Sequence, residues 1–191
     1  MAPNGNELYS FWDALVNGRS GIGLITKFDA SGQRARIAGE IKDFDPESAL
    51  DPKDVRRNDP FTHYAMYVGS QAVAHAGLDM EAVDAERVGV IWGSGIGGIT
   101  THEKQHTILM EKGPKRISPF YVPMMISDMA AGMISMVLGA KGPNYATVSA
   151  CSSASHALGE AARKIQYDEA DVMVTGGSEA AVTSISVAGF A

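Results

Sequence analysis

The sequence predicts an α/β fold with a largely parallel sheet, because three short strand-like runs each end in a turn of small residues. Val88–Trp92 is a nearly continuous apolar run, which is typical of a strand buried on both faces of a parallel sheet. Tyr145–Val148 and Asp171–Thr175 are two further runs of strand formers. Segments with helical spacing separate the three runs, and strands that alternate with helices indicate an α/β sandwich.

The composition is that of an ordinary globular protein. The 191 residues are 45% hydrophobic and 20% charged, which is enough chain for one sizeable core, and no internal repeat or linker divides them. The single cysteine excludes a disulfide within the chain and a cysteine-rich zinc site, and it favours a reducing, cytoplasmic location. No apolar run reaches the roughly 20 residues that span a bilayer. A formal net charge of −6 argues against nonspecific binding to nucleic acid.

The N-terminal part is expected to hold one helix followed by a loop. Apolar residues recur at helical spacing at Leu8, Phe11, Trp12 and Leu15. We expect this stripe to pack in the core and the helix to end near Gly18. The stretch 21–39 is interpreted as loop, and a short extended segment is expected at 35–41.

Positive charge is concentrated at Lys53, Arg56 and Arg57, within a polar stretch that covers residues 45–59. On a helix these three side chains would share one face. Both a solvated face and a docking surface for an acidic partner explain such a cluster.

A second helix is predicted over Phe61–Ala76, with Gly77 as its end. His63 and His75 have no partner at metal-ligand spacing, so both are expected to be structural.

The run Gly93-Ser94-Gly95-Ile96-Gly97-Gly98 follows the first predicted strand. It lacks the Gly-Lys-Ser/Thr of a phosphate-binding loop and the glycine spacing of a dinucleotide site. Close approach of the backbone to a substrate or to another chain explains these glycines better.

His102-Glu103-Lys104-Gln105-His106 matches the spelling of the zinc-protease motif, but this segment is polar throughout and has no obvious third ligand. We therefore expect no metal site.

The prolines of Pro119–Pro123 predict an extended segment, with Pro123 at the first position of a helix that continues to Leu138. This helix, Met124–Leu138, is rich in methionine. Core packing is the default interpretation, and an adaptable surface for an acyl chain or a partner is the alternative. Gly139 and the turn at 142–144 are expected to end it.

Cys151 lies in a bend of small residues between a predicted strand and a predicted helix that contains Ala157, Ala161 and Ile165. A thiol attacks as the thiolate, and the free N–H groups at a helix N-terminus favour an anion there. The same N–H groups can hold the oxyanion of a tetrahedral intermediate. A lone cysteine is often only a small core residue. The flanking small residues favour a nucleophile, because they let a substrate approach closely.

Several motifs occur in one order along nearly the whole chain and together resemble one family. They are Gly93–Gly98, Ile117–Pro123, Gly142-Pro143-Asn144, Ser149–Ser153 with His156, Asp171–Val174 with Gly176–Glu179, and Ala188-Gly189-Phe190. The sequence resembles the β-ketoacyl-acyl carrier protein synthases of the thiolase-like fold, and most of all the synthase II type. The resemblance implies a layered α/β/α fold with a mostly parallel, mixed sheet. Residues 1–191 would form its N-terminal domain, without the family's first strand and without its C-terminal half.

The resemblance also implies a function and a set of site residues. Cys151 would accept an acyl group from acyl carrier protein, and its N–H would be one oxyanion donor. The acyl chain would then condense with malonyl-carrier protein, with no cofactor and no metal. Positions that line or gate the acyl pocket correspond to Ile96, Tyr121 and Phe190, and Tyr121 stands where phenylalanine is common. The basic docking face for the carrier corresponds to Lys53, Arg56 and Arg57, with Lys115 and Arg116 as a second patch.

His156 resembles a structural position of the helix after the nucleophile rather than a catalytic one. The catalytic histidines of the family belong to the C-terminal half, so we expect no condensation by this segment alone. A homodimer is implied, with no nucleic-acid or membrane partner. Two alternatives remain open: a noncatalytic partner subunit such as a chain-length factor, and a ketosynthase of a polyketide pathway.

Overall fold

The computed structural model describes residues 1–191, which form two compact units. The larger unit covers residues 49–180, and the smaller unit combines residues 1–48 with residues 181–191.

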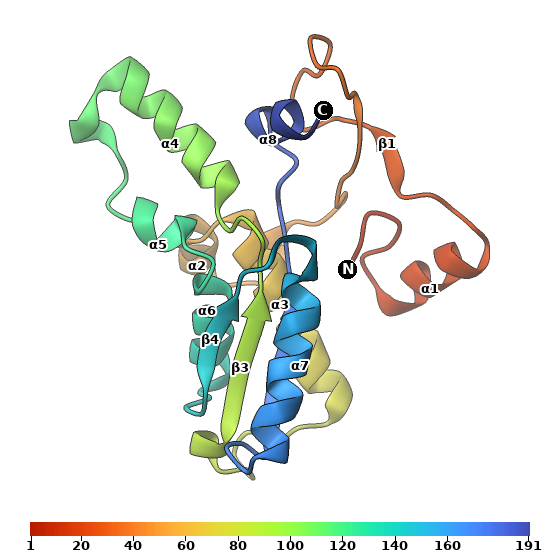
Figure 1. Ribbon diagram of the computed structural model, residues 1–191, viewed down its shortest axis with the longest axis vertical. Coiled ribbons are helices and arrows are strands. Elements are labelled where there is room, and N and C mark those ends of the chain that lie inside the picture. The colour runs from red at the N-terminus through yellow and green to blue at the C-terminus, as the bar shows by residue number, and fades with distance from the viewer. The chain divides into compact units, whose positions relative to one another are not determined.

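The larger unit is built on a three-stranded parallel sheet (Figure 1). Strand β3 (Val88–Gly93) is central, with β4 (Asn144–Thr147) on one side and β5 (Val172–Gly177) on the other. Both neighbours run parallel to β3, and in register Trp92 lies opposite Ala146 and Gly176. The sequence prediction of three parallel strands is confirmed, and all of β3 is buried as its apolar run predicts.

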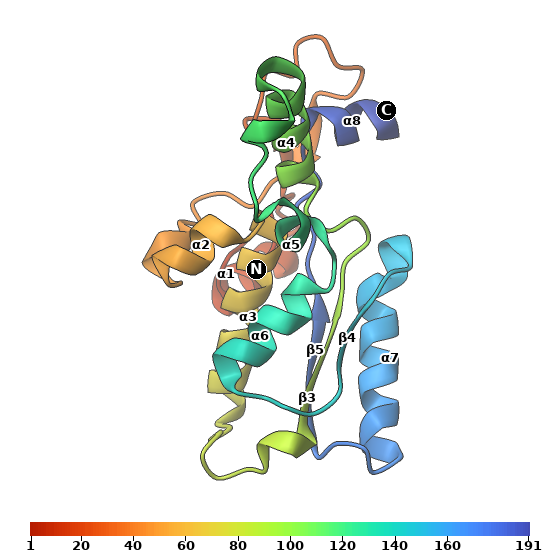
Figure 2. The ribbon, with the colours of Figure 1, turned by 90° about the vertical axis from the view of Figure 1, so that its left-hand side faces the viewer.

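Helices cover both faces of this sheet. Figure 2 shows α7 (Ser153–Gln166) on one face and α3 (Pro60–Ala76) with α6 (Met129–Leu138) on the other. The main core lies under α3 and α6, where Phe61 and Ile134 pack around Val90. A smaller core lies under α7, where Ala157 and Ala161 pack on Ile91. The resulting α/β/α arrangement is the one expected from the alternation of strands and helices.

Helix α3 ends before Gly77 as its sequence predicts, and it begins one residue before the predicted start at Phe61. Asp59 is its N-cap and accepts the N–H of Phe61, while Pro60 takes the first helical position, where no N–H is needed. Gly77 ends the helix in the left-handed conformation, at φ +63°. His63 is buried in this helix, and its Nε2 lies 3.0 Å from the carbonyl oxygen of Val55, so the neutral ring donates through Nε2–H. His63 is therefore structural, as expected.

Burial lowers the pKa of His63, although its hydrogen bond to a backbone carbonyl partly opposes this shift. The unfolded chain binds a proton at about pH 6.5, where the folded chain does not. The contribution of the neutral His63 ring to the free energy of unfolding is therefore complete above about pH 6.5, and it is lost as the pH falls below that value. We expect denaturant melts from pH 7.5 to 5.5, a window of about one unit on each side, to show this loss in the wild type and not in His63→Gln. His75→Gln, at an exposed position of the same helix, is the control and should melt like the wild type at every pH. Identical pH profiles for wild type and His63→Gln would contradict the assignment.

Two short helices and two longer ones complete the larger unit. They are α2 (Pro52–Arg57), α4 (Ile99–Lys112), α5 (Tyr121–Met125) and α6. Two predictions for this region are wrong. Pro119–Pro123 is not extended throughout, because α5 begins at Tyr121 and Pro123 lies within its first turn. The single helix predicted for Met124–Leu138 is interrupted, because the carbonyl of Met125 accepts the N–H of Gly98 and the backbone at Ile126 is extended.

The smaller unit contains α1 (Leu8–Val16), β1 (Ile22–Leu24), β2 (Ile37–Gly39) and α8 (Ser184–Phe190). β1 and β2 pair antiparallel. β2 lies inside the extended segment expected at 35–41, whereas β1 falls in a stretch interpreted as loop. The side chain of Gln33 joins this unit's two pieces by donating to the carbonyl and the hydroxyl of Ser184.

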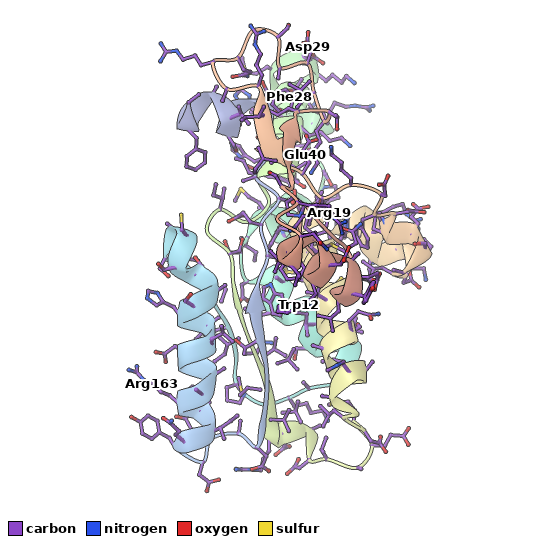
Figure 3. All side chains as sticks on the ribbon, turned by 90° about the vertical axis from the view of Figure 1, so that its right-hand side faces the viewer. Trp12, Arg19, Phe28, Asp29, Glu40 and Arg163 are labelled. Atoms are coloured by element: carbon purple, nitrogen blue, oxygen red, sulfur yellow. The ribbon has the colours of Figure 1, made fainter.

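The apolar stripe of α1 does not form a core in the smaller unit. Leu8 and Trp12 are 72% and 62% exposed, and only Ala14 of this helix is buried. Trp12 is labelled in Figure 3. The expected core packing is therefore wrong for the chain by itself, because the small two-stranded sheet offers no large apolar face.

Glu40, also labelled in Figure 3, holds the loop after β1. Burial would raise the pKa of Glu40, but its hydrogen bonds from Thr26 and Lys27 together outweigh burial and lower it.

No helix of either unit is both long enough and apolar enough to cross a bilayer.

Candidate active site

Cys151 lies on a tight turn between β4 and α7, as the sequence predicts. The chain leaves β4 at Thr147, passes through a 3-10 turn over Ala150–Ser152, and enters α7 at Ser153. Cys151 is the only cysteine, carries a free thiol and is exposed. The turn therefore presents the sulfur to solvent at the start of a helix. We refer to residues 149–152 as the cysteine elbow.

The hydroxyl of Ser153 holds the two sides of the cysteine elbow together. Its Oγ accepts the N–H of Ser149 at 2.9 Å and donates to the carbonyl of Ala150 at 2.7 Å. The hydroxyl of Thr147 in turn donates to the carbonyl of Ser153 at 2.8 Å. Ser153 belongs to the sequence motif Ser149–Ser153, but no role was expected for Ser153 or for Thr147. Their only local signal was a serine at the first position of a helix, which is common at helix starts.

The backbone of the elbow is strained at the residue before the sulfur. Ala150 has φ +51°, one of only three non-glycine residues with positive φ. A residue with a side chain costs about 1–3 kcal/mol in a sparsely populated region, and such residues cluster at active sites. The N–H of Cys151 has no hydrogen-bond partner in the protein. This geometry can provide the oxyanion donor that the sequence led us to expect.

Glycines bring the carboxyl ends of the strands close to α7. A Cβ on Gly93 would lie 2.5 Å from the carbonyl oxygen of Ser153, and a Cβ on Gly177 would lie 2.5 Å from the Cβ of Ala154. Neither contact is possible for atoms that are not bonded. The ends of β3 and β5 therefore tolerate only glycine where they meet the first turn of α7, and this contact fixes the position of the elbow.

The loop that follows β3, residues 94–97, also lies against the elbow. The Cβ position of Gly95 is 3.3 Å from the carbonyl oxygen of Ala150 and 3.4 Å from its Cα. The loop carries Ile96, which is 40% exposed. The structure thus brings Ile96 and Cys151 onto neighbouring segments of the larger unit. Phe190 lies on α8, which belongs to the smaller unit.

Tyr121, at the start of α5, has a polar partner. Its hydroxyl lies 2.7 Å from Nδ1 of His102, and the ring of His106 stacks on that of His102 with centroids 6.4 Å apart. The hydroxyl of Tyr121 is therefore matched by a histidine on α4. No group of three or more His, Cys, Asp or Glu side chains in the protein could hold a metal ion.

The hydrogen bond of the His156 ring is to Ser149 and not to the thiol of Cys151. Its Nδ1 lies 2.6 Å from the hydroxyl of Ser149, seven residues earlier in the cysteine elbow. Both residues line a shallow cavity with Val148, Gly159 and Arg163. The ion pair between Arg163 and Glu160 lies on the same exposed side of α7.

The five basic residues expected to dock a carrier are all exposed on the larger unit. Lys53, Arg56 and Arg57 lie on α2, while Lys115 and Arg116 lie on a 3-10 turn after α4. None of them forms an ion pair with the protein's own carboxylates. The guanidinium of Arg57 stacks over the ring of Phe120 at 4.9 Å. This contact orients Arg57 beside an apolar groove lined by Pro123, Met129 and Met133.

Solved structures of similar fold come from ketosynthases. The ishigamide ketosynthase/chain length factor matches with a TM-score of 0.89 at 22% identity, over 99% of this chain and 47% of that chain. A type II polyketide ketosynthase in complex with its acyl carrier protein matches with a TM-score of 0.83 at 22% identity, over 99% and 50%. A beta-ketoacyl synthase from Burkholderia phymatum STM815 matches with a TM-score of 0.85 at 25% identity, over 99% and 47%. These similarities confirm the thiolase-like fold class.

Relatives found by sequence share a higher percentage of identical residues with this chain than these solved structures do. A 3-oxoacyl-[acyl-carrier-protein] synthase 2 from Synechocystis sp. is 49% identical over 191 residues, which are 100% of this chain and 46% of the relative. A protein of the same name from Staphylococcus aureus is 47% identical over 190 residues, 47% of its length. The chain thus spans about half the length of the curated relatives it matches. The family model for the beta-ketoacyl synthase N-terminal domain matches residues 1–191. The chain therefore belongs to the beta-ketoacyl synthase family, as its N-terminal domain.

Proposed function

We propose that this chain supplies the acyl-accepting nucleophile of a 3-oxoacyl-[acyl-carrier-protein] synthase, and that Cys151 is this nucleophile. The observation that carries the proposal is the exposed thiol on a strained elbow at the start of α7. Cysteine nucleophiles need an accessible sulfur and nearby N–H donors, and this elbow offers both. The name of the curated relatives at 47–49% identity supports the same reaction.

In the first step, the Cys151 thiolate attacks the carbonyl carbon of an acyl-carrier thioester. The developing oxyanion would be held by the N–H of Cys151, and collapse of the tetrahedral intermediate expels the carrier's thiolate, which takes up a proton. The acyl group is then bound to Cys151 as a thioester. Ile96 and Tyr121 would line the path of its alkyl chain.

In the second step, a malonyl-carrier thioester loses carbon dioxide, and its carbanion attacks the acyl carbonyl. The bond to the sulfur breaks, Cys151 leaves as thiolate, and the product is a β-ketoacyl chain two carbons longer. This step needs general acid–base support, which in the family comes from histidines outside this segment. We therefore expect the segment alone to accept acyl groups but not to condense them. The proposed reaction needs no cofactor.

The partner would be acyl carrier protein, loaded with an acyl or a malonyl group. Lys53, Arg56 and Arg57 offer exposed positive charge with no internal ion pair, as a docking site for an acidic partner requires. Lys115 and Arg116 would extend this surface. One ketosynthase of similar fold was solved in complex with its acyl carrier protein, which supports this choice of partner.

A noncatalytic subunit is a second candidate, because one solved structure of similar fold is a ketosynthase/chain length factor. Retention of the cysteine favours the enzyme, since such partners usually lack the nucleophile. A polyketide ketosynthase would use the same elbow, so only the substrate separates it from a fatty-acid enzyme.

We further propose a homodimer, which would use the unpaired outer edge of β4 next to the elbow. The free, exposed thiol supports a reducing, cytoplasmic location.

Mass spectrometry of the intact protein after incubation with octanoyl-carrier protein tests this function. We expect one octanoyl adduct, located at Cys151 by peptide mapping, and none in Cys151→Ala. A charge reversal of Arg56 and Arg57 to glutamate should slow the transfer from the carrier by about tenfold or more, while leaving alkylation of Cys151 by iodoacetamide unchanged. A folded wild type that takes up no octanoyl group would support the noncatalytic subunit instead.

A further inference from the structure

The carboxylate of Glu179, just after β5, holds the whole loop 94–97. Its Oε2 accepts the N–H of Gly95 at 2.8 Å and the N–H of Ile96 at 3.1 Å. Its Oε1 accepts the hydroxyl of Ser94 at 3.3 Å. The Ser94 Oγ in turn accepts the N–H of Gly97 at 3.1 Å. All four residues of the loop are thus bonded to this carboxylate, either directly or through Ser94.

Gly95 is packed between this carboxylate and the cysteine elbow. Its Cβ position lies 3.0 Å from Oε2 of Glu179 and 3.3 Å from the carbonyl oxygen of Ala150. A side chain would be crowded on both sides. The position of the carboxylate therefore sets how closely the loop approaches the residue before Cys151.

The far end of the loop is fixed from another direction. Gly97 has φ +73°, and its Cβ position lies 2.6 Å from the carbonyl oxygen of Met125. The loop is thus held between Glu179 on one side and the end of α5 on the other. Ile96 is the only large side chain that this loop carries, so a shift of the loop displaces Ile96 first.

No lysine, arginine or histidine forms an ion pair with Glu179. N–H and O–H dipoles are therefore its partners, and these bonds are stronger to a charged acceptor than to a neutral one. A glutamine at this position would lose the charge and would turn an N–H₂ group toward at least one of the present donors.

We infer that Glu179 is a positioning residue that fixes the loop 94–97, and with it Ile96, against the cysteine elbow, and so determines how well long acyl chains reach Cys151. The inference rests on the proposed function, because it concerns the acyl group that Cys151 accepts. An acyl chain long enough to pass Ile96 meets a side chain whose place the carboxylate sets. A butanoyl group or a small alkylating reagent is much less affected.

The test compares three rates of Cys151 modification in the intact protein: transfer from dodecanoyl-carrier protein, transfer from butanoyl-carrier protein, and alkylation by iodoacetamide. We expect Glu179→Gln to lower the ratio of dodecanoyl to butanoyl transfer by about tenfold, the effect of losing one hydrogen bond to a charged acceptor. The alkylation rate should stay at the wild-type value. Glu81→Gln, at an exposed position of the same unit, is the matched control and should leave all three rates unchanged.

Ser94→Ala keeps the charge but removes two of the bonds, so it should lower the same ratio by a smaller factor of about three. It decides the question if Glu179→Gln does not fold. An unchanged ratio, or an equal decrease of all three rates, would overturn the inference while leaving the proposed function intact. A wild type that accepts neither acyl group would overturn the proposed function, and the inference with it.

Discussion

Gly93→Ala is expected to prevent acyl transfer to Cys151 by displacing the first turn of α7. The added Cβ would lie 2.5 Å from the carbonyl oxygen of Ser153 and 2.6 Å from the backbone nitrogen of Ala154. Both neighbours are backbone atoms of a helix that packs on the sheet, so no flexible side chain can move away. Overpacking of this kind costs about 3 kcal/mol or more. The hydrogen bonds of Ser153 that shape the elbow would be broken at the same time.

Thermal unfolding and the octanoyl transfer assay measure the two effects of Gly93→Ala. Gly32→Ala is the matched control, because it makes the same change at an exposed glycine with no atom within 4 Å of its Cβ position. The control should unfold and react like the wild type. If Gly93→Ala unfolded at the wild-type temperature and still accepted octanoyl groups, the close contact between β3 and α7 would not be what fixes the elbow.

Asp59→Ala is expected to lower the free energy of unfolding by about 3 kcal/mol, because one buried carboxylate caps two helices. Asp59 is completely buried. Its Oδ1 accepts the N–H of Phe61 at the start of α3, and its Oδ2 accepts the N–H and the hydroxyl of Thr101 at the start of α4. Alanine would leave all three donors without a partner, and buried donors without partners are costly.

Asp59→Asn is the control for the charge, since its amide oxygen can still accept from Thr101. We expect a smaller loss of about 1 kcal/mol in urea melts at neutral pH. Burial raises the pKa of Asp59, the hydrogen bonds from Thr101 and Phe61 oppose this, and the negative charge of Glu179 adds to the increase. Because the pKa of Asp59 is higher in the folded chain than in the unfolded chain, there is a pH window in which only the folded chain keeps this carboxyl protonated. The window runs from about pH 3.9, the unfolded value, up to the folded pKa. The free energy of unfolding of the wild type therefore decreases as the pH rises through this window. Asp59→Asn has no carboxyl to titrate here, so the difference in the free energy of unfolding between wild type and Asp59→Asn should shrink over the same window. Equal losses for Asp59→Ala and Asp59→Asn at every pH would contradict this double cap.

The strands and the cysteine elbow could be predicted because their signals are local. An uninterrupted apolar run identifies a strand covered on both faces, as at Val88–Trp92, whatever the rest of the chain does. A bend of small residues before a helical pattern places Cys151 at a helix start. The resemblance to condensing enzymes also followed from short motifs, and the family match confirms it.

Helix continuity in the methionine-rich segment was not predictable in the same way. Helical propensity runs on from Met124, but a distant N–H, that of Gly98, takes the carbonyl of Met125 and the backbone turns at Ile126. The antiparallel pair of β1 and β2 was half missed for a similar reason. A three-residue strand has too little periodicity to be recognised without its partner.

The sequence by itself determined the three parallel strands, the ends of several helices and the place of the only cysteine at a helix start, since each depends on residues a few positions apart. Only the tertiary structure decided what holds that sulfur in place. Gly95 and Glu179 are 84 positions apart, and Asp59 and Thr101 are 42 apart, yet each pair is joined by a hydrogen bond of 2.8 Å. No local pattern encodes such a pairing, because a carboxylate in a polar stretch has the same sequence signal whether it faces solvent or fixes a loop.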